Sequence, residues 1–359
     1  MDNSLHHLLP MFERARTEGS PLVLATVTAT RGSTYRKAGA QLLVGPGGKF
    51  EGLLSGGCLE GDLAERAASV LETGQPKLVS YENSGEDDLL WGLGSGCEGG
   101  MDIWLMRLDA ANGWEPLATV ADRLERHESV TYGLVLESGA PALPAGAVAW
   151  VPAIRSLPPG LPEPMSAWIH DVLATHDTPR EARIAEFESP RIRIFAATVV
   201  PQKELLLLGA GPDALPVVEF AATLGWRVTL VDHRPRYADA ARFPGARHVL
   251  AARPGEIAGQ LDLSHFDAAV IMSHHLATDL ASLAALAPTN IPYVGLLGPS
   301  ARRKRLLADL DPATTALLDG RLRSPVGLDL GGRDPASIAL AIVAEVQAFF
   351  HGRGHGGAP

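Results

Sequence analysis

Apolar and polar positions alternate in blocks along the second half of the chain. Short apolar runs, typical of buried strands, lie at residues 205–208, 227–231, 248–250, 268–272 and 293–296. The segments between them are apolar on one face, which is the pattern of amphipathic helices. Strands that alternate with helices predict a parallel sheet covered on both sides, so we expect a doubly wound domain over residues 201–350.

The first half has a different order of elements. Residues 1–20 predict a helix and residues 21–30 a strand, and Gly45-Pro46-Gly47-Gly48 is typical of a hairpin turn between two further strands. One more helix and two more strands are expected at 63–73, 77–81 and 101–108. Together these elements predict an α+β domain over residues 1–110.

The middle of the chain and its end give weaker signals. Residues 111–200 are rich in proline, and we expect their strands to complete the sheet of the first domain before a linker to the second. The tail, residues 351–359, is expected to be disordered. The predicted fold class is α/β: an N-terminal α+β domain followed by a doubly wound parallel sheet.

Composition narrows the class of protein. The 359 residues are 46% hydrophobic and 20% charged, as in soluble globular proteins, and the net charge of −10 lacks the basic footprint of a nucleic-acid-binding protein. Neither a membrane span nor a secretory signal is indicated. With two cysteines the chain has no disulfide framework, so we expect a cytoplasmic protein. A homodimer is expected from the frequency of dimers among soluble proteins.

The first strand of the second domain runs into a glycine-rich turn. Gly209 and Gly211 belong to a Gly-x-Gly-x-x-Ala pattern, and Asp232 ends the next strand about 20 residues later. In a dinucleotide-binding unit, the turn and the following helix bind phosphate, and the acid binds a ribose hydroxyl. The pattern predicts a Rossmann-like domain; a turn of this kind that binds nothing is the alternative.

A basic loop follows the first strand of the chain. Arg31, Ser33 and Arg36 lie in it, with a further cation and a further hydroxyl beside them. Arginine and hydroxyl donors can converge on a phosphate or another oxyanion. The alternative is a solvated basic turn without a ligand.

Both cysteines lie in glycine-rich segments. Cys58 follows Gly56 and Gly57 shortly before a predicted helix, and Cys97 lies in a second glycine-rich segment before a strand. Near a helix N-terminus the pKa of a cysteine thiol falls, and the thiolate can bind a soft metal or attack an electrophile. Each cysteine could instead be a small buried hydrophobe.

The fourth strand of the second domain ends in Ser273-His274-His275. Ligands of doubly wound sheets bind beyond the carboxyl ends of the strands, so His274 is a candidate donor to a ligand. We expect Asp279 to cap the helix that follows. The run Arg302–Arg305 either binds an anion or forms a solvated helix face.

A series of these segments, in order, resembles the XdhC/CoxI family, the accessory factors of xanthine dehydrogenase and related molybdenum hydroxylases. The segments are residues 30–44, 52–63, 92–105, 205–235, 272–280, 293–307 and 324–346. Tyr35, Ala38 and His275 differ from the residues that are common in the family at these places.

The resemblance implies that the protein binds the molybdenum cofactor, protects it, supports its sulfuration and delivers it to the apo form of a molybdenum hydroxylase. A cysteine desulfurase is an implied further partner. The protein would then be a cofactor chaperone rather than an enzyme with its own turnover. For this chain, the resemblance implies that Cys58 is the main cofactor-binding residue and the metal ligand. Cys97 is the second candidate for contact with the cofactor. The phosphate of the cofactor would suit Gly209 and Gly211, and its other anionic parts would suit the basic loop.

Two other classes of protein stay open. One is an NAD(P)-dependent oxidoreductase or nucleotide sensor, in which Asp232 would favour NAD, although no hydride-transfer pair is evident in the sequence. The other is a structural assembly component of the hydroxylase whose glycine loops bind no ligand. The sequence does not identify the hydroxylase that is served.

Overall fold

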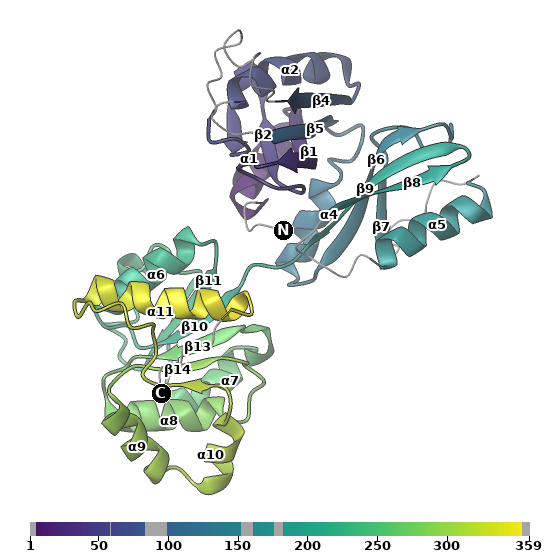
Figure 1. Ribbon diagram of the computed structural model, residues 1–359. Coiled ribbons are helices and arrows are strands. Elements are labelled where there is room, and N and C mark those ends of the chain that lie inside the picture. Colours follow the sequence, from purple (N-terminus) through teal and green to yellow (C-terminus); the bar gives the residue numbers. More distant parts are fainter. Residues whose placement is uncertain (1–4, 58, 83–98, 152–160, 176–181, 354–359) are drawn as a thin grey trace. The chain divides into compact units, whose positions relative to one another are not determined.

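The computed structural model describes residues 5–57, 59–82, 99–151, 161–175 and 182–353. The chain divides into two compact units, Met1–Pro201 and Gln202–Pro359. Figure 1 shows both units, coloured along the sequence. Each unit combines helices and strands and has hydrophobic cores of its own.

A five-stranded antiparallel sheet begins the first unit, with strand order β3-β2-β1-β5-β4. Its strands are β1 (Leu22–Gly32), β2 (Gln41–Val44), β3 (Phe50–Gly52), β4 (Lys77–Glu82) and β5 (Gly99–Leu108), and its helices are α1 (Leu5–Glu18) and α2 (Glu60–Thr73). The predicted hairpin is confirmed, because β2 and β3 pair directly with each other.

The central strand β1 is buried on both of its faces. Leu22 and Leu24 share a core with Phe12 of α1, whereas Val23 shares a different core with Leu63 of α2. Successive side chains of a strand point to opposite faces of the sheet. The two helices therefore cover opposite faces of this sheet.

Residues 111–200 do not complete that sheet, contrary to the expectation from the sequence. They form a separate four-stranded antiparallel sheet, with the order β7-β6-β9-β8. Its strands are β6 (Val130–Ser138), β7 (Val148–Val151), β8 (Arg183–Glu188) and β9 (Arg191–Val199), accompanied by α4 (Leu117–Glu125) and α5 (Glu163–Ala174). The hydrophobic pattern of a strand shows which of its faces is buried. It does not show which other strand is its neighbour in the sheet. The two sheets instead meet in one core that contains Trp104, Tyr132 and Phe195.

Helix α5 lies in the proline-rich middle of the chain and was not predicted from the sequence. Pro162 is the N-cap of this helix, and Pro164 lies in its first turn. Proline is tolerated there because the first N–H groups of a helix have no carbonyl partner within it. Met165, Ile169 and Leu173 are buried at helical spacing, in a core shared with β6 and β9.

The second unit contains a six-stranded, fully parallel sheet with the order β12-β11-β10-β13-β14-β15. Its strands are β10 (Glu204–Leu208), β11 (Arg227–Asp232), β12 (His248–Ala251), β13 (Ala268–Ile271), β14 (Val294–Leu296) and β15 (Leu322–Arg323). Counted from β10, this is the strand order of a Rossmann fold, and it confirms the predicted fold class. The direction of winding reverses between β10 and β13, which is where such folds bind ligands.

Helices cover both faces of the parallel sheet (Figure 1). One core contains α6 (Ala214–Thr223) and α11 (Pro335–Phe350), and the other contains α7 (Ile257–Gln260), α8 (Leu276–Leu286), α9 (Ser300–Asp309) and α10 (Pro312–Leu318). None of the helices in the described ranges is long and apolar enough to cross a membrane.

A buried hydrogen bond joins the two sheets of the first unit. Gln41 Nε2 donates to Tyr132 Oη over 2.9 Å and to Thr26 Oγ1 over 3.2 Å. The ring of Tyr132 also lies 5.8 Å from the ring of Trp150, measured between centroids. Tyr132 therefore contributes both a hydrogen-bond acceptor and packing to the shared core.

Replacing Tyr132 with phenylalanine is expected to lower the free energy of unfolding by about 1 to 2 kcal/mol, because the buried Gln41 amide loses an acceptor. Tyr132→Ala also removes the ring and should lower it by about 3 to 5 kcal/mol. Urea unfolding followed by tryptophan fluorescence measures both variants. Equal stability of the phenylalanine variant and the natural protein would contradict a contribution of the hydroxyl.

Candidate functional site

The glycine turn after β10 packs directly on the backbone that follows β13. Gly209 has a φ of +125°, and a Cβ at this position would lie 2.5 Å from the carbonyl oxygen of Met272. Glycine tolerates both the positive φ and this close approach to Met272, because it has no Cβ. At Gly211, the carboxylate of Asp213 occupies the place that a Cβ would take. Gly209 is thus required by the turn itself.

The Asp232 carboxylate, at the end of β11, is engaged within the protein. Its Oδ2 accepts the Ala210 N–H at 2.8 Å and Nη2 of Arg234 at 2.7 Å, and its Oδ1 accepts the backbone N–H and Nε of Arg234, both at 2.9 Å. Burial opposes the charge, but the hydrogen bonds from Arg234 and Ala210 outweigh it and lower the pKa of Asp232. The spacing predicted a ribose-binding acid. In the structure these bonds take up the lone pairs of the carboxylate and tie the turn to β11.

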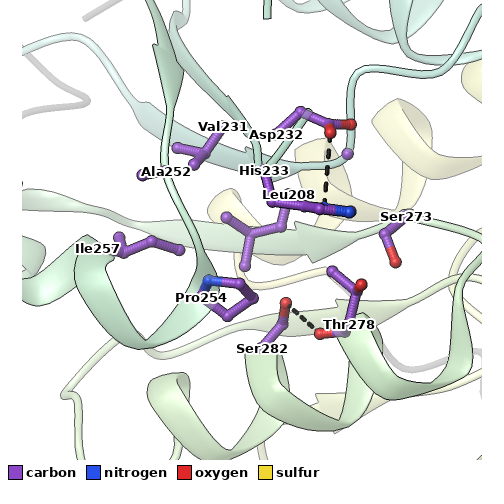
Figure 2. Close-up of a pocket in the computed structure, with 11 residues that line it drawn as sticks. Leu208, Val231, Asp232, His233, Ala252, Pro254, Ile257, Ser273, Thr278 and Ser282 are labelled. Atoms are coloured by element: carbon purple, nitrogen blue, oxygen red, sulfur yellow. Dashed lines mark hydrogen bonds and ion pairs between the residues drawn. The ribbon is translucent and has the colours of Figure 1, made fainter. Parts of the chain in front are cut away.

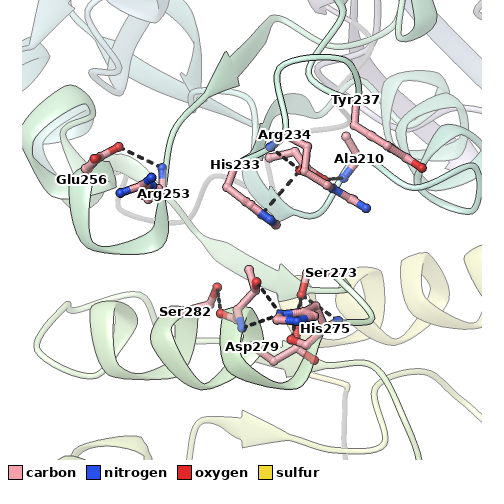
Figure 3. Close-up of polar contacts among 12 residues, drawn as sticks. Ala210, His233, Arg234, Tyr237, Arg253, Glu256, Ser273, His275, Asp279 and Ser282 are labelled. Atoms are coloured by element: carbon pink, nitrogen blue, oxygen red, sulfur yellow. Dashed lines mark hydrogen bonds and ion pairs between the residues drawn. The ribbon is translucent and has the colours of Figure 1, made fainter.

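Arg234 bonds to Asp232 and also lies beside the ring of Tyr237, and Figure 3 labels Arg234 and Tyr237. Its guanidinium lies 3.8 Å from the centroid of the Tyr237 ring, a cation–π contact. Arg242 approaches the same ring at 5.5 Å and donates to the carbonyl oxygens of Ala210 and Tyr237 at 3.4 and 3.1 Å. Two arginines therefore gather near the carboxyl end of β11.

His274 lies in the loop after β13, where the sequence predicted a donor to a ligand. Its φ is +59°, which is uncommon for a residue with a Cβ. Its Nε2 lies 2.6 Å from Oδ2 of Asp213, and the imidazole is 58% exposed against 17% for the carboxylate. This histidine–aspartate pair joins the glycine turn to the loop at the point where the winding of the sheet reverses.

Asp279 does not cap α8, contrary to the expectation. The N-cap is His275, whose Nδ1 accepts the Thr278 N–H at 3.4 Å. Asp279 lies in the first turn of the helix, is 1% exposed and accepts from Ser273 Oγ at 2.5 Å and from Arg302 Nε and Nη2 at 3.0 and 2.5 Å. A carboxylate inside the first turn can reach neighbouring elements, and this one ties the loop after β13 to α9. Part of this network is visible in Figure 3.

A small hollow opens at the carboxyl ends of β10 and β11 (Figure 2). Its lining combines apolar residues, Leu208, Val231, Ala252, Pro254 and Ile257, with polar residues, Asp232, His233, Ser273, Thr278 and Ser282. The hollow lies where a Rossmann fold binds its ligand.

In the first unit, the chain before α2 wraps around the carboxylate of Glu60. Oε1 accepts the N–H groups of Leu54 and Ser55, both at 2.8 Å, and Oε2 accepts Ser55 Oγ at 2.7 Å and the Gly57 N–H at 3.0 Å. Glu60 is 1% exposed. Burial opposes its charge, but the hydrogen bonds from Ser55 and Leu54 outweigh it and lower the pKa of Glu60.

Gly56 and Gly57 lie on the outside of this Glu60 loop, residues 54–57. Their φ angles are +77° and +108°, and a Cβ on either residue would meet no atom of the described residues within 4 Å. The positive φ angles therefore favour glycine at both positions. The next residue in sequence is Cys58, which lies outside the described residues, as does Cys97.

Arg31 of the predicted oxyanion loop is engaged by acidic side chains. Its Nη1 and Nη2 donate to Asp102 Oδ2 and Oδ1 at 2.8 and 3.0 Å, and Nη2 lies 3.3 Å from Glu82 Oε1. The hydrogen bonds to Asp102 raise the pKa of Arg31. The pair lies just beyond a bulge, where the register of β1 on β5 shifts between Val27 and Ala29.

Arg36 and Ser33 have surroundings different from those of Arg31. Arg36 donates from Nε to the carbonyl oxygen of Leu53 at 3.1 Å, and burial lowers the pKa of Arg36. Ser33 is exposed. Arg36 thus lies against the segment that leads into the Glu60 loop, whereas Arg31 holds β1 to β5.

Sequence reasoning named neither Glu60 nor Asp213 as an organising residue. The sequence does contain a signal for the role of Glu60. This residue stands at the start of a helix directly after a glycine-rich turn, where a carboxylate can reach back to free N–H groups. For Asp213 the partner is His274, 61 residues further along the chain. No local pattern indicates such a pair.

Family models match both units. The model of the XdhC Rossmann domain matches residues 205–346, and the model of the XdhC and CoxI family matches residues 15–82. Two separate stretches of the chain thus point to the same family.

Whole proteins also align over most of the chain. A Bacillus subtilis (strain 168) protein, named as a probable subunit of xanthine dehydrogenase, is 32% identical over 90% of this chain and 92% of its own. The molybdenum cofactor insertion chaperone PaoD of Escherichia coli (strain K12) is 24% identical over 93% of this chain and 85% of its own. A crystal structure described as a xanthine dehydrogenase from Bacillus halodurans is 30% identical, with a TM-score of 0.77 over 100% of this chain and 98% of its own. As its motifs predicted, the chain belongs to the XdhC and CoxI family.

Proposed function

We propose that this protein binds the molybdenum cofactor in the cytoplasm and inserts it into a molybdenum hydroxylase of the xanthine dehydrogenase type. The names of two relatives support this: one is an insertion chaperone for that cofactor, and the other is a probable subunit of xanthine dehydrogenase. The proposed partners are the apo-hydroxylase, a cysteine desulfurase that supplies sulfur for the cofactor, and a second copy of this chain. The protein acts as a carrier, without turnover of its own.

The proposal depends chiefly on the fixed conformation of the Glu60 loop. This loop directly precedes Cys58 in sequence, and α2 begins two residues after that cysteine. A thiol close to a helix N-terminus favours its thiolate form, and a thiolate is a good ligand for a soft metal. Gly56 and Gly57 are exposed, so a ligand has access to this part of the loop.

The residue after the loop, Cys58, has the chemistry to hold the metal end of the cofactor. When bound, the cofactor supplies a pterin whose dithiolene holds molybdenum, together with a phosphate. Cys58 is the proposed metal ligand, and Cys97 is a second proposed contact. Arg36, which lies against Leu53, adds positive charge for the anionic parts of the ligand. Glu60 holds the loop in place without contacting the ligand.

An NAD(P)-dependent oxidoreductase is the second candidate, favoured by the Rossmann strand order and the hollow at β10 and β11. Asp232 would have to bind a ribose hydroxyl, and its lone pairs are taken by Ala210 and Arg234. A substrate-dependent change in the absorbance of nicotinamide would support this candidate.

The apoprotein, mixed with released cofactor and passed through gel filtration, is expected to retain close to one molybdenum and one pterin per chain. Cys58→Ser should abolish the retention of molybdenum, because a hydroxyl is a poor ligand for a soft metal. Cys97→Ser is the matched control and should retain more than the Cys58 variant. Metal analysis and pterin fluorescence measure the two parts of the cofactor separately. No retention by the natural protein, together with tight binding of NAD, would favour the oxidoreductase.

Glu60→Gln is expected to lower the free energy of unfolding by about 2 to 3 kcal/mol, because the amide group of glutamine places a donor against N–H groups that need an acceptor. Retention of the cofactor should fall as the loop loses its conformation. Glu65→Gln, on the exposed side of α2, is the control and should change stability by less than about 0.5 kcal/mol. An unaltered stability of Glu60→Gln would show that the carboxylate does not organise the loop.

The Glu60 carboxylate also predicts a loss of stability in acid. Its pKa in the folded protein lies below the ordinary value of 4.5, so the stabilisation is fully present above that pH. It is lost as the pH falls from 4.5 through the lower pKa of the folded state. Urea unfolding across this range should show a steeper decline for the natural protein than for Glu60→Gln. Parallel curves would contradict the assignment.

A further inference from the structure

Asp213 places a carboxylate at the glycine turn of the second unit. It is the residue before α6, yet among the described residues its side chain makes no capping hydrogen bond to that helix. Its Oδ2 is instead held at 2.6 Å by Nε2 of His274. Its other oxygen fills the space that a Cβ on Gly211 would take, and Cδ2 of His274 lies 3.9 Å from the same point.

A pyrophosphate in a Rossmann fold binds to the N–H groups of this turn and of the helix that follows. Several of those groups have other partners in this chain. The Ala210 N–H bonds to Asp232 at 2.8 Å, the Ala214 N–H bonds to the Gly211 carbonyl at 3.1 Å, and Pro212 has no N–H to donate. The turn therefore offers a phosphate fewer donors than its sequence pattern predicted.

The negative charge of Asp213 also disfavours a phosphate at the turn. A phosphate at the turn would lie close to the Asp213 carboxylate, and two like charges repel strongly where water is partly excluded. The carboxylate is only 17% exposed, so water screens it incompletely.

We propose that Asp213, held by His274, excludes phosphate groups from the glycine turn, so that this Rossmann unit discriminates against NAD(P) and other nucleotides. This replaces the phosphate-binding role that the sequence predicted for Gly211. If the molybdenum cofactor enters this unit, which rests on the proposed function, its phosphate points away from the turn.

The test is a calorimetric titration of ADP and of NAD⁺ into the full-length protein and three variants. Asp213→Ser removes the charge and leaves a residue that is favoured before a helix, and Asp213→Asn removes the charge with little change of shape. Asp309→Ser removes one negative charge from an exposed position of the same unit. We expect both Asp213 variants to bind ADP at least about tenfold more tightly than the natural protein, and Asp309→Ser to match the natural protein.

One result would overturn the proposal: folded Asp213 variants that bind ADP no more tightly than the natural protein. Circular dichroism shows whether each variant is folded, and either Asp213 variant alone is sufficient for the comparison. Retention of molybdenum is measured separately on the same samples. Its absence would refute the proposed function while the gain in ADP affinity still supports the exclusion of phosphate.

Discussion

A buried carboxylate that accepts backbone N–H bonds fixes each of the two glycine turns on which the candidate sites depend. Glu60 does this for residues 54–57, and Asp232 does it for the turn at Gly209. Glycine loses more conformational freedom on folding than any other residue. Hydrogen bonds to an ionised acceptor are stronger than bonds between neutral groups, so one carboxylate can offset the entropy of ordering a whole turn.

Both turns therefore have their conformation without a ligand. A ligand that meets such a turn does not have to order it, which leaves more of the interaction energy for affinity. The same arrangement restricts what the carboxylate can do. In this structure the lone pairs of Asp232 already serve Ala210 and Arg234. An acid of the dinucleotide fingerprint thus also stabilises the fold of this chain.

The sequence predicted the second unit closely because parallel strands that are buried on both faces appear as uninterrupted apolar runs. The first unit was harder: the strand pattern of 130–199 did not show that these strands pair among themselves, and Pro162 and Pro164 hid α5. At the sites, the positions of the glycines and of His274 were found from their motifs. Their partners were not, since the contact between Asp213 and His274 exists only once β10 and β13 lie next to each other.

Strand β1 is buried on both faces, and this affects how its alignment on β5 is determined. Its two faces are both apolar and both covered, so a slip by one residue would exchange the faces without exposing apolar surface to water. Burial alone thus leaves the alignment of β1 on β5 open. The bulge between Val27 and Ala29 and the two-pronged contact of Arg31 with Asp102 distinguish one alignment from the other. Polar contacts, those of Arg31 and the buried bond of Thr26 among them, therefore distinguish strand pairings that hydrophobicity alone does not.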